Sequence, residues 1–132
     1  MANKYRSNFE RSVAAYLKKK KIKYGYETTK FPFVQPAKKR VYIPDFAITG
    51  AFIECKGKLT KEDRDKLLWV REQNPDMRLF LVFMRGRNPI RKGSPTTYMM
   101  WAAENNIPAF DWDQQQDLNK WLASALSAEE QT

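Results

Sequence analysis

The stretches IPDF at residues 43–46 and FIECKG at residues 52–57 decide how this sequence is interpreted. They belong to two segments, 41–48 and 51–56, that are rich in the β-branched and aromatic residues of strands. Thr49-Gly50 joins the two segments, and a glycine can supply the positive φ that a two-residue turn requires. The sequence therefore predicts a β-hairpin at the centre of the fold.

The register of this hairpin follows from its turn. A two-residue loop pairs Ile48 with Ala51. Counting back along both strands then places Asp45 directly opposite Glu54, with their Cβ atoms about 4.5–5.5 Å apart on one face. Because side chains alternate across a strand, Lys56 shares that face with Glu54. The hairpin is therefore expected to present two carboxylates and an ammonium group together.

Facing carboxylates in a sheet repel each other unless something positive lies between them. Mg²⁺ binds few protein carboxylates, keeps several waters and completes its coordination with phosphate oxygens. Asp45 and Glu54 are therefore candidate metal ligands, and Lys56 is a candidate for holding the scissile phosphate or the attacking water. Taken singly, each residue is explained more simply as a strand-start residue or a solvated charge. The apolar residues that flank all three indicate an interior hairpin, where unpaired charged groups are energetically costly.

The segments around the hairpin predict an α/β fold with a mixed sheet. The expected helices cover residues 7–20, 60–73, 94–104 and a last segment from 113, and the other expected strands cover 22–27, 79–84 and 107–112. Residues 31–40 contain two prolines and are expected to form an extended connection rather than a regular element. Thr60 and Asp63 are placed as a variant capping pair, and Ser94-Pro95 as a helix N-cap followed by proline at the first helical position.

Charge and composition limit the possible functions. The 132 residues suffice for one domain, and 24 Lys and Arg against 15 Asp and Glu give a formal charge of +9. Residues 1–58 hold 14 basic and 4 acidic side chains, which favours a polyanionic partner such as nucleic acid. The chain has no histidine, which excludes Ser-His-Asp and Cys-His catalysis and His-ligated metal sites. Hydrolysis would therefore have to use carboxylates, lysine and hard metal ions.

The single cysteine and the hydropathy pattern indicate a compartment. Cys55 alone cannot form an intramolecular disulfide, which favours a reducing environment, and its place in the hairpin makes it a small core residue. The N-terminus lacks the apolar stretch of a secretory signal, and no stretch approaches the ~20 apolar residues of a membrane span. We therefore expect a cytoplasmic protein with no membrane partner.

The Pro-Asp…Glu-x-Lys pattern resembles the restriction-endonuclease-like superfamily of metal-dependent nucleases. Within that superfamily the chain is most similar to the phage endonuclease I family, which resolves four-way DNA junctions. The similarity extends from about Ser7 to Phe110 and rests on residues 42–46 (YIPDF), 52–57 (FIECKG), 71–75 (REQNP) and 92–98 (KGSPTTY). The combination of the hairpin motif with the KGSPT segment is more specific than the hairpin motif alone.

The resemblance implies Mg²⁺-dependent hydrolysis of phosphodiester bonds in branched DNA, with Mn²⁺ as a substitute and no small-molecule cofactor. It adds Glu10 and the backbone carbonyl of Cys55 to a metal site formed by Asp45 and Glu54. Taken from the residues alone, Glu10 would be the third helical residue of a capping box whose N-cap is Ser7. The agreement with the family motif favours a catalytic role for Glu10 instead.

The resemblance also implies an intertwined homodimer of a single nuclease domain spanning residues 1–132. Residues 1–32 would be exchanged between subunits, 33–39 would form the bridge, 40–127 the catalytic core and 128–132 a frayed tail. Glu10 would then serve the site of the partner. If a phage encodes the protein, its location would be the host cytoplasm.

Basic residues outside the hairpin are candidates for DNA contacts. The loop 85–93 contains no acidic residue and precedes an expected helix N-terminus, where backbone N–H groups attract phosphate. The candidate DNA-binding residues are Arg85, Arg87, Arg91, Lys92, Ser94, Thr96, Lys38, Lys39 and Arg40. Two other functions stay open, a nicking endonuclease that acts on linear duplex DNA and a DNA-binding module that does not cut. The intact set of Glu10, Asp45, Glu54 and Lys56 favours an enzyme over the last of these.

Overall fold

The computed structural model describes residues 4–35 and 38–130, with only the backbone described for 125–130. Within these residues, five strands form one sheet in the order β1-β4-β5-β6-β7, and β2 and β3 form a separate hairpin. The strands are β1 (Gly25–Tyr26), β2 (Phe31–Gln35), β3 (Lys38–Tyr42), β4 (Phe46–Ile48), β5 (Ala51–Lys56), β6 (Leu79–Phe83) and β7 (Ala109–Asp111). The helices are α1 (Asn8–Lys19), α2 (Lys61–Gln73), α3 (Tyr98–Glu104) and α4 (Gln116–Glu130). The sheet is mixed, because β5, β6 and β7 are parallel while β1 and β4 are antiparallel to their neighbours, so the predicted class is confirmed.

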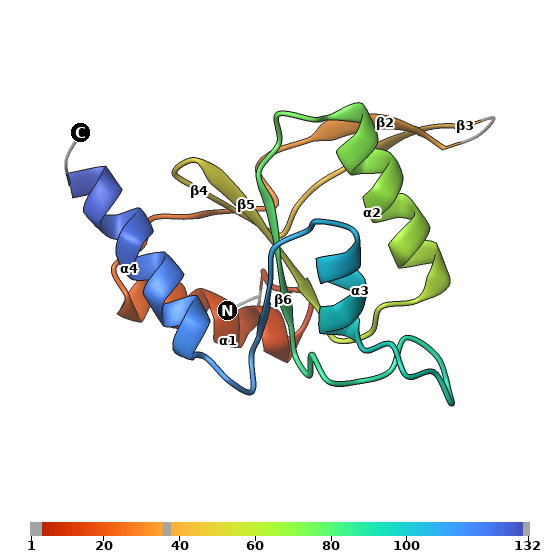
Figure 1. Ribbon diagram of the computed structural model, residues 1–132. Helices are drawn as coiled ribbons and strands as arrows, with labels where there is room; N and C mark the ends of the chain where they lie inside the picture. The colour runs from red at the N-terminus through yellow and green to blue at the C-terminus, as the bar shows by residue number, and fades with distance from the viewer. Residues whose placement is uncertain (1–3, 36–37, 131–132) are drawn as a thin grey trace.

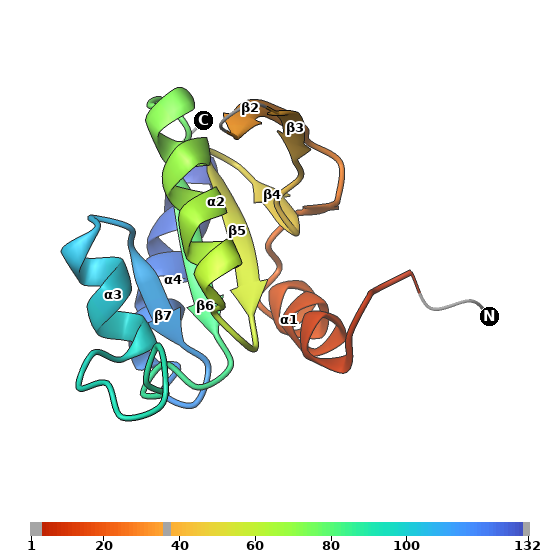
Figure 2. The same ribbon diagram turned by 90° about the vertical axis from the view of Figure 1, so that its right-hand side faces the viewer.

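The sheet lies between two layers of helices. Helices α2 and α3 cover one face, and α1 and α4 cover the other (Figures 1 and 2). Each face has its own core, one centred on Leu67 and Phe83 and the other on Leu17 and Phe46, all of which are buried. All five residues of β6 are buried, as a strand covered on both faces requires, which confirms the prediction from the apolar run.

The central turn and register agree with the prediction. Gly50 has φ +77, and Ile48 pairs with Ala51 across the turn. The predicted strand 41–48 is nevertheless interrupted, since β3 ends at Tyr42 and β4 begins at Phe46. Pro44 lies in the interruption and has no N–H to donate to a ladder. The first strand is also shorter than the predicted 22–27 and keeps only two residues.

The prediction of an irregular connection over residues 31–40 is wrong. Strands β2 and β3 pair in register, with Phe31 opposite Tyr42. Packing outweighs the proline content, because Phe33 is buried in the core and the Gln73 side chain of α2 forms hydrogen bonds with both backbone groups of Val34. Figure 1 shows this hairpin extending from the body of the molecule beside the C-terminal end of α2. Of the expected bridge 33–39, residues 36–37 lie outside the described residues.

Two helix boundaries also differ from the prediction. Helix α3 does not begin after Ser94 but after Thr97, whose side chain accepts a hydrogen bond from the Met100 N–H. The Ser94 hydroxyl instead accepts from the Thr96 N–H at 3.1 Å, which forms a local turn. Helix α4 extends through Glu130, past residue 128 where the tail is expected to begin, and 131–132 are outside the described residues. Among the described residues, no helix has the length and hydropathy needed to cross a membrane.

Candidate active site

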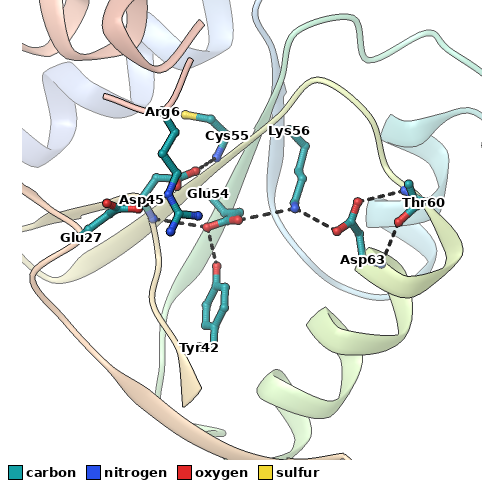
Figure 3. A network of polar contacts seen from close by, with 9 residues as sticks. All are labelled: Arg6, Glu27, Tyr42, Asp45, Glu54, Cys55, Lys56, Thr60 and Asp63. Carbon is teal, nitrogen blue, oxygen red and sulfur yellow. Dashed lines mark hydrogen bonds and ion pairs between the residues drawn. The ribbon is translucent and has the colours of Figure 1, made fainter. Parts of the chain in front are cut away.

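Strand β5 separates a charged face from an apolar one. Ile53 and Cys55 join the core formed with α1 and α4, while Glu54 and Lys56 point to the opposite face. Figure 3 shows the Cys55 sulfur directed away from Glu54. Burial raises the pKa of the Cys55 thiol well above its ordinary value, and the nearby Asp45 and Glu54 charges raise it further. The thiol is therefore a core group without nucleophilic character, as predicted.

Asp45 and Glu54 lie together as the register requires. Glu54 Oε1 accepts hydrogen bonds from the Tyr42 hydroxyl at 2.8 Å and from the Asp45 N–H at 3.3 Å. Asp45 Oδ2 accepts from the Cys55 N–H at 2.8 Å. Both residues are buried, with relative exposures of 6% for Asp45 and 7% for Glu54. Two carboxylates are thus fixed by backbone and hydroxyl donors in a largely dry environment.

Lys56 is held between two carboxylates. Its Nζ lies 3.6 Å from Glu54 Oε2 and 3.1 Å from Asp63 Oδ1, and 14% of its side chain is exposed (Figure 3). Burial lowers the pKa of Lys56, but the charges of Glu54 and Asp63 outweigh burial and raise it above its ordinary value. Lys56 is therefore a cation at neutral pH, suited to binding a phosphate rather than to accepting a proton.

Glu10 stands in the first turn of α1. Ser7 is the N-cap and accepts the Glu10 N–H at 3.0 Å, which confirms the helix start. The Glu10 carboxylate accepts from the Arg6 N–H at 3.0 Å and from the Tyr26 hydroxyl. It is buried and lines the same cavity as Asp45. Within the single chain, Glu10 therefore faces the hairpin of its own chain.

These residues surround one cavity of about 400 Å³. The structure brings all five residues of the predicted catalytic and metal-binding set to its lining: Glu10, Asp45, Glu54, Cys55 and Lys56. Basic side chains contribute to the lining as well, namely Arg6, Arg40 and Lys66. The cavity can therefore hold an anion beside a cluster of carboxylates.

The electrostatics of this cluster favour an added cation. Burial raises the pKa of Asp45 to about 8, the Glu54 and Glu10 charges contribute to this rise, and the Cys55 N–H opposes it. Burial also raises the pKa of Glu54, against the lowering effects of Lys56 and Tyr42. Carboxylate and carbonyl oxygens are the ligands that Mg²⁺ prefers, so the donor set fits this ion. Among the described residues, no group of three His, Cys, Asp or Glu side chains is arranged to hold a metal ion by itself, so a site that includes Glu10, Asp45 and Glu54 together requires some rearrangement of their side chains.

The candidate DNA-binding residues lie in two separate places. The loop after β6 carries Arg85, Arg87, Arg91 and Lys92, which are all exposed, and the half-buried Ser94 and Thr96. Lys38, Lys39 and Arg40 are exposed on β3, near the opposite end of the molecule (Figure 1). Of these nine residues, only Arg40 lines the cavity.

Three residues at this site have no catalytic or binding role predicted from the sequence. Tyr42 donates to Glu54, Asp63 contacts Lys56, and Lys66 lines the cavity with its Nζ 5.7 Å from the centre of the Tyr42 ring. A partial signal exists for two of them. Asp63 and Lys66 are three residues apart on α2, which places them on one helix face. Nothing in the sequence indicates which element that face meets.

Sequence comparisons identify the family to which these residues belong. The family described as Phage endonuclease I matches residues 1–117. Endodeoxyribonuclease 1 of Enterobacteria phage T3 is 41% identical over 104 residues, which are 78% of this chain and 68% of that protein. Endonuclease I of Escherichia phage T7 is 40% identical over 108 residues, or 81% and 72% of the two chains. Since the family match covers most of the sequence and includes every residue that surrounds the cavity, the chain belongs to the phage endonuclease I family.

Proposed function

We propose that this protein is a metal-dependent DNA endonuclease that hydrolyses phosphodiester bonds in branched DNA, with four-way junctions as the preferred substrate. The observation that carries the proposal is the convergence of Glu10, Asp45, Glu54 and Lys56 on one cavity. Relatives named endodeoxyribonuclease 1 and endonuclease I support DNA as the substrate and cleavage within the strand as the reaction.

Different residues of the cavity would bind the metal ion and the phosphate. Asp45, Glu54 and the Cys55 carbonyl would hold Mg²⁺, with Glu10 completing the site and Mn²⁺ as a substitute. When bound, the ion lowers the pKa of a coordinated water and stabilises charge that develops on the phosphate. Lys56 binds a phosphate oxygen with its fixed positive charge. Tyr42 and the Asp45 N–H hold Glu54 in one orientation, so that Glu54 itself needs little rearrangement when substrate arrives.

One cleavage assay tests both the metal and the substrate. It compares a four-way junction, a nicked duplex and a linear duplex at equal concentration, in Mg²⁺, in Mn²⁺ and in excess chelator. We expect the junction to be cut fastest and no cutting without a divalent cation. Faster cutting of the linear duplex would replace junction resolution by nicking, and cutting in chelator would exclude the metal mechanism.

Matched variants separate cutting from binding. Asp45→Ala or Glu54→Ala should abolish cutting and leave DNA affinity largely intact, because binding depends mainly on Lys and Arg contacts with phosphate. Asp76→Ala is the control, since this exposed carboxylate lies outside the cavity. A variant of Asp45 or Glu54 that cuts at the original rate would contradict the site, and a protein that binds junctions but never cuts would be a binding module.

The loop after β6 is proposed to contact phosphates. Replacing Arg85, Arg87 and Arg91 together with alanine should weaken binding to all sequences and flatten the salt dependence by up to ~0.9 in slope for each lost contact. The measurement is the DNA dissociation constant over a series of salt concentrations. An unchanged slope would place the loop away from the DNA.

We also propose that the active protein is a homodimer in which residues 1–32 are exchanged, so that two sites can cut two symmetry-related strands. The exchange requires the pairing of Phe31 and Pro32 with β3 of the same chain to be replaced by pairing with β3 of the partner. Mixing Glu10→Ala with Glu54→Ala subunits tests the exchange. If Glu10 acts on the partner's site, the mixed dimer has one intact site and nicks, although each variant alone is inactive. If Glu10 acts within its own chain, both sites of the mixed dimer are damaged and cutting stays absent. A monomer by light scattering at assay concentration would contradict the dimer itself.

A further inference from the structure

The ammonium group of Lys56 has two anionic neighbours from different parts of the fold. Glu54 belongs to the same strand, and its Oε2 lies 3.6 Å from Lys56 Nζ. Asp63 belongs to the start of α2, and its Oδ1 lies closer, at 3.1 Å. The nearer partner of the proposed catalytic lysine is therefore a residue outside the proposed metal site.

The start of α2 fixes the position of the Asp63 carboxylate. Asp63 Oδ2 accepts the Thr60 N–H at 3.0 Å, and the Asp63 N–H donates to the Thr60 hydroxyl at 3.1 Å, which completes a capping box. Asp63 Oδ1 is left for Lys56, as Figure 3 shows. The positive end of the helix dipole also favours a carboxylate at this point. One side chain thus caps a helix with one oxygen and holds a lysine with the other.

A fixed carboxylate is useful because a lysine side chain is long and flexible. Glu54 Oε1 already accepts from Tyr42 and from the Asp45 N–H, and Glu54 is proposed to share its charge with a metal ion. Asp63 is not a proposed metal ligand, and its contact with Thr60 uses the other oxygen, so it can keep Lys56 in place whether or not a cation is bound. Lys56 also lines the cavity, so its remaining N–H groups are available to a phosphate there.

We propose that Asp63 is a positioning residue for catalysis, which aims the Lys56 ammonium at the scissile phosphate from the N-terminus of α2. The proposal rests on the function proposed above for Lys56. It assigns to Asp63 no contact with substrate or metal.

The test is Asp63→Asn, which preserves the shape and the ability to accept the Thr60 N–H while it removes the charge beside Lys56. We expect the single-turnover cleavage rate in Mg²⁺ to fall about 10- to 100-fold on the substrate that the wild type cuts fastest. We expect the dissociation constant for DNA, measured without divalent cations, to change less than about twofold, because Asp63 makes no phosphate contact. A rate change without an affinity change is not expected of general destabilisation.

Two controls separate positioning from helix capping. Asp65→Asn makes the same chemical change on the same helix, where the half-buried carboxylate pairs with Lys61 at 3.4 Å and lies outside the cavity, and it should leave the rate unchanged. Thr60→Ala removes a cap acceptor but keeps the Asp63 charge and the Thr60 N–H, so it should lower the melting temperature and leave the rate near that of the wild type. A wild-type rate in Asp63→Asn, or an equal rate loss in Thr60→Ala, would overturn the proposal.

Lys56→Ala distinguishes a failure of this proposal from a failure of the proposed site. If Lys56→Ala cuts DNA at the wild-type rate, the function assigned to Lys56 is wrong and the role of Asp63 falls with it. If Lys56→Ala is inactive and Asp63→Asn is fully active, the site stands and only the positioning role is overturned.

Discussion

Helices α1 and α2 begin with the same sequence signature, and the acidic residue of each first turn lies near the β4–β5 hairpin. In each, a hydroxyl residue is the N-cap and an acidic residue follows three positions later, as Ser7 with Glu10 and Thr60 with Asp63. The two acidic side chains behave differently. Asp63 reaches back to the N-cap N–H and completes a capping box, whereas Glu10 accepts instead from the residue before the N-cap and from Tyr26.

The charges around the two acids also differ. Asp63 meets the positive charge of Lys56, and although burial alone would raise the Asp63 pKa, the contacts with Lys56 and Thr60 lower it. Glu10 adds a negative charge beside Asp45 and contributes to the raised pKa of that group. A capping signature therefore locates a helix start but does not show which charge the acidic residue will meet. At α2 opposite charges are paired, and at α1 two acidic groups face each other.

Removing the negative charge of Glu10 should slow cleavage more than any other change at the two helix starts. Glu10→Gln keeps an acceptor for the Arg6 N–H and the Tyr26 hydroxyl but removes the charge, so single-turnover cleavage in Mg²⁺ should fall about 100-fold. Ser7→Ala removes the cap acceptor only and should leave the rate nearly unchanged. Rates are measured on the preferred DNA substrate, with helix content checked by circular dichroism. Equal rates for Glu10→Gln and the wild type would mean that Glu10 is a structural residue.

The part of the site that could be predicted is the part encoded locally. Alternation along β5 and a two-residue turn suffice to bring Asp45, Glu54 and Lys56 together, since each is within one hairpin of the others. The burial of the carboxylates follows from their apolar neighbours. Glu10 was reached through family resemblance and not through spacing, because its distance from the hairpin depends on how α1 packs.

The missed features depend on contacts between elements far apart in the sequence. Strands β2 and β3 form a hairpin because Gln73 binds the backbone of Val34 and Phe33 packs in the core. No local pattern in residues 31–40 predicts these distant partners. The prediction of Asp63 as a capping residue is confirmed. Its contact with Lys56, however, requires the end of β5 and the start of α2 to be adjacent. Ser94-Pro95 fits the pattern of a helix start, but the same residue types also form the local turn that the structure has here.

The stability of the metal-free protein should depend on pH in opposite ways through Asp45 and Asp63. The pKa of Asp45 is near 4 in an unfolded chain and about 8 in the metal-free folded protein, so the folded state binds the proton more tightly. This contribution to stability is complete below about pH 4 and is lost as the pH rises towards 8. The lowered pKa of Asp63 acts oppositely, but only where the pH falls below the ordinary range of Asp. We therefore expect the metal-free protein to melt at a lower temperature at pH 8 than at pH 6.

Asp45→Asn provides the matching variant for this pH effect. It should stabilise the metal-free protein at pH 8 and weaken the pH dependence, while it abolishes cleavage. Mg²⁺ or Mn²⁺ at millimolar concentration should raise the melting temperature of the wild type and not that of the variant. Calorimetry from pH 5 to 8.5 measures both effects, with Asp76→Asn as the control. A wild type more stable at pH 8 than at pH 6 without metal would show that Asp45 does not bear the burial penalty.

The smallest effects concern the caps, where the two helices should behave alike. Ser7 and Thr60 each accept one backbone N–H through the side-chain oxygen, so alanine at either position should cost about 1 kcal/mol of unfolding free energy. Ser7 and Thr60 share no hydrogen-bond partner, and their helices cover opposite faces of the sheet. The double variant should therefore lose the sum of the two costs, within about 0.5 kcal/mol, in denaturant unfolding. A larger departure from additivity would mean that the two helix starts communicate through the hairpin between them. In that case the helix starts that carry Glu10 and Asp63 would be energetically coupled. The two acidic residues would then belong to one network and not to two independent helix ends.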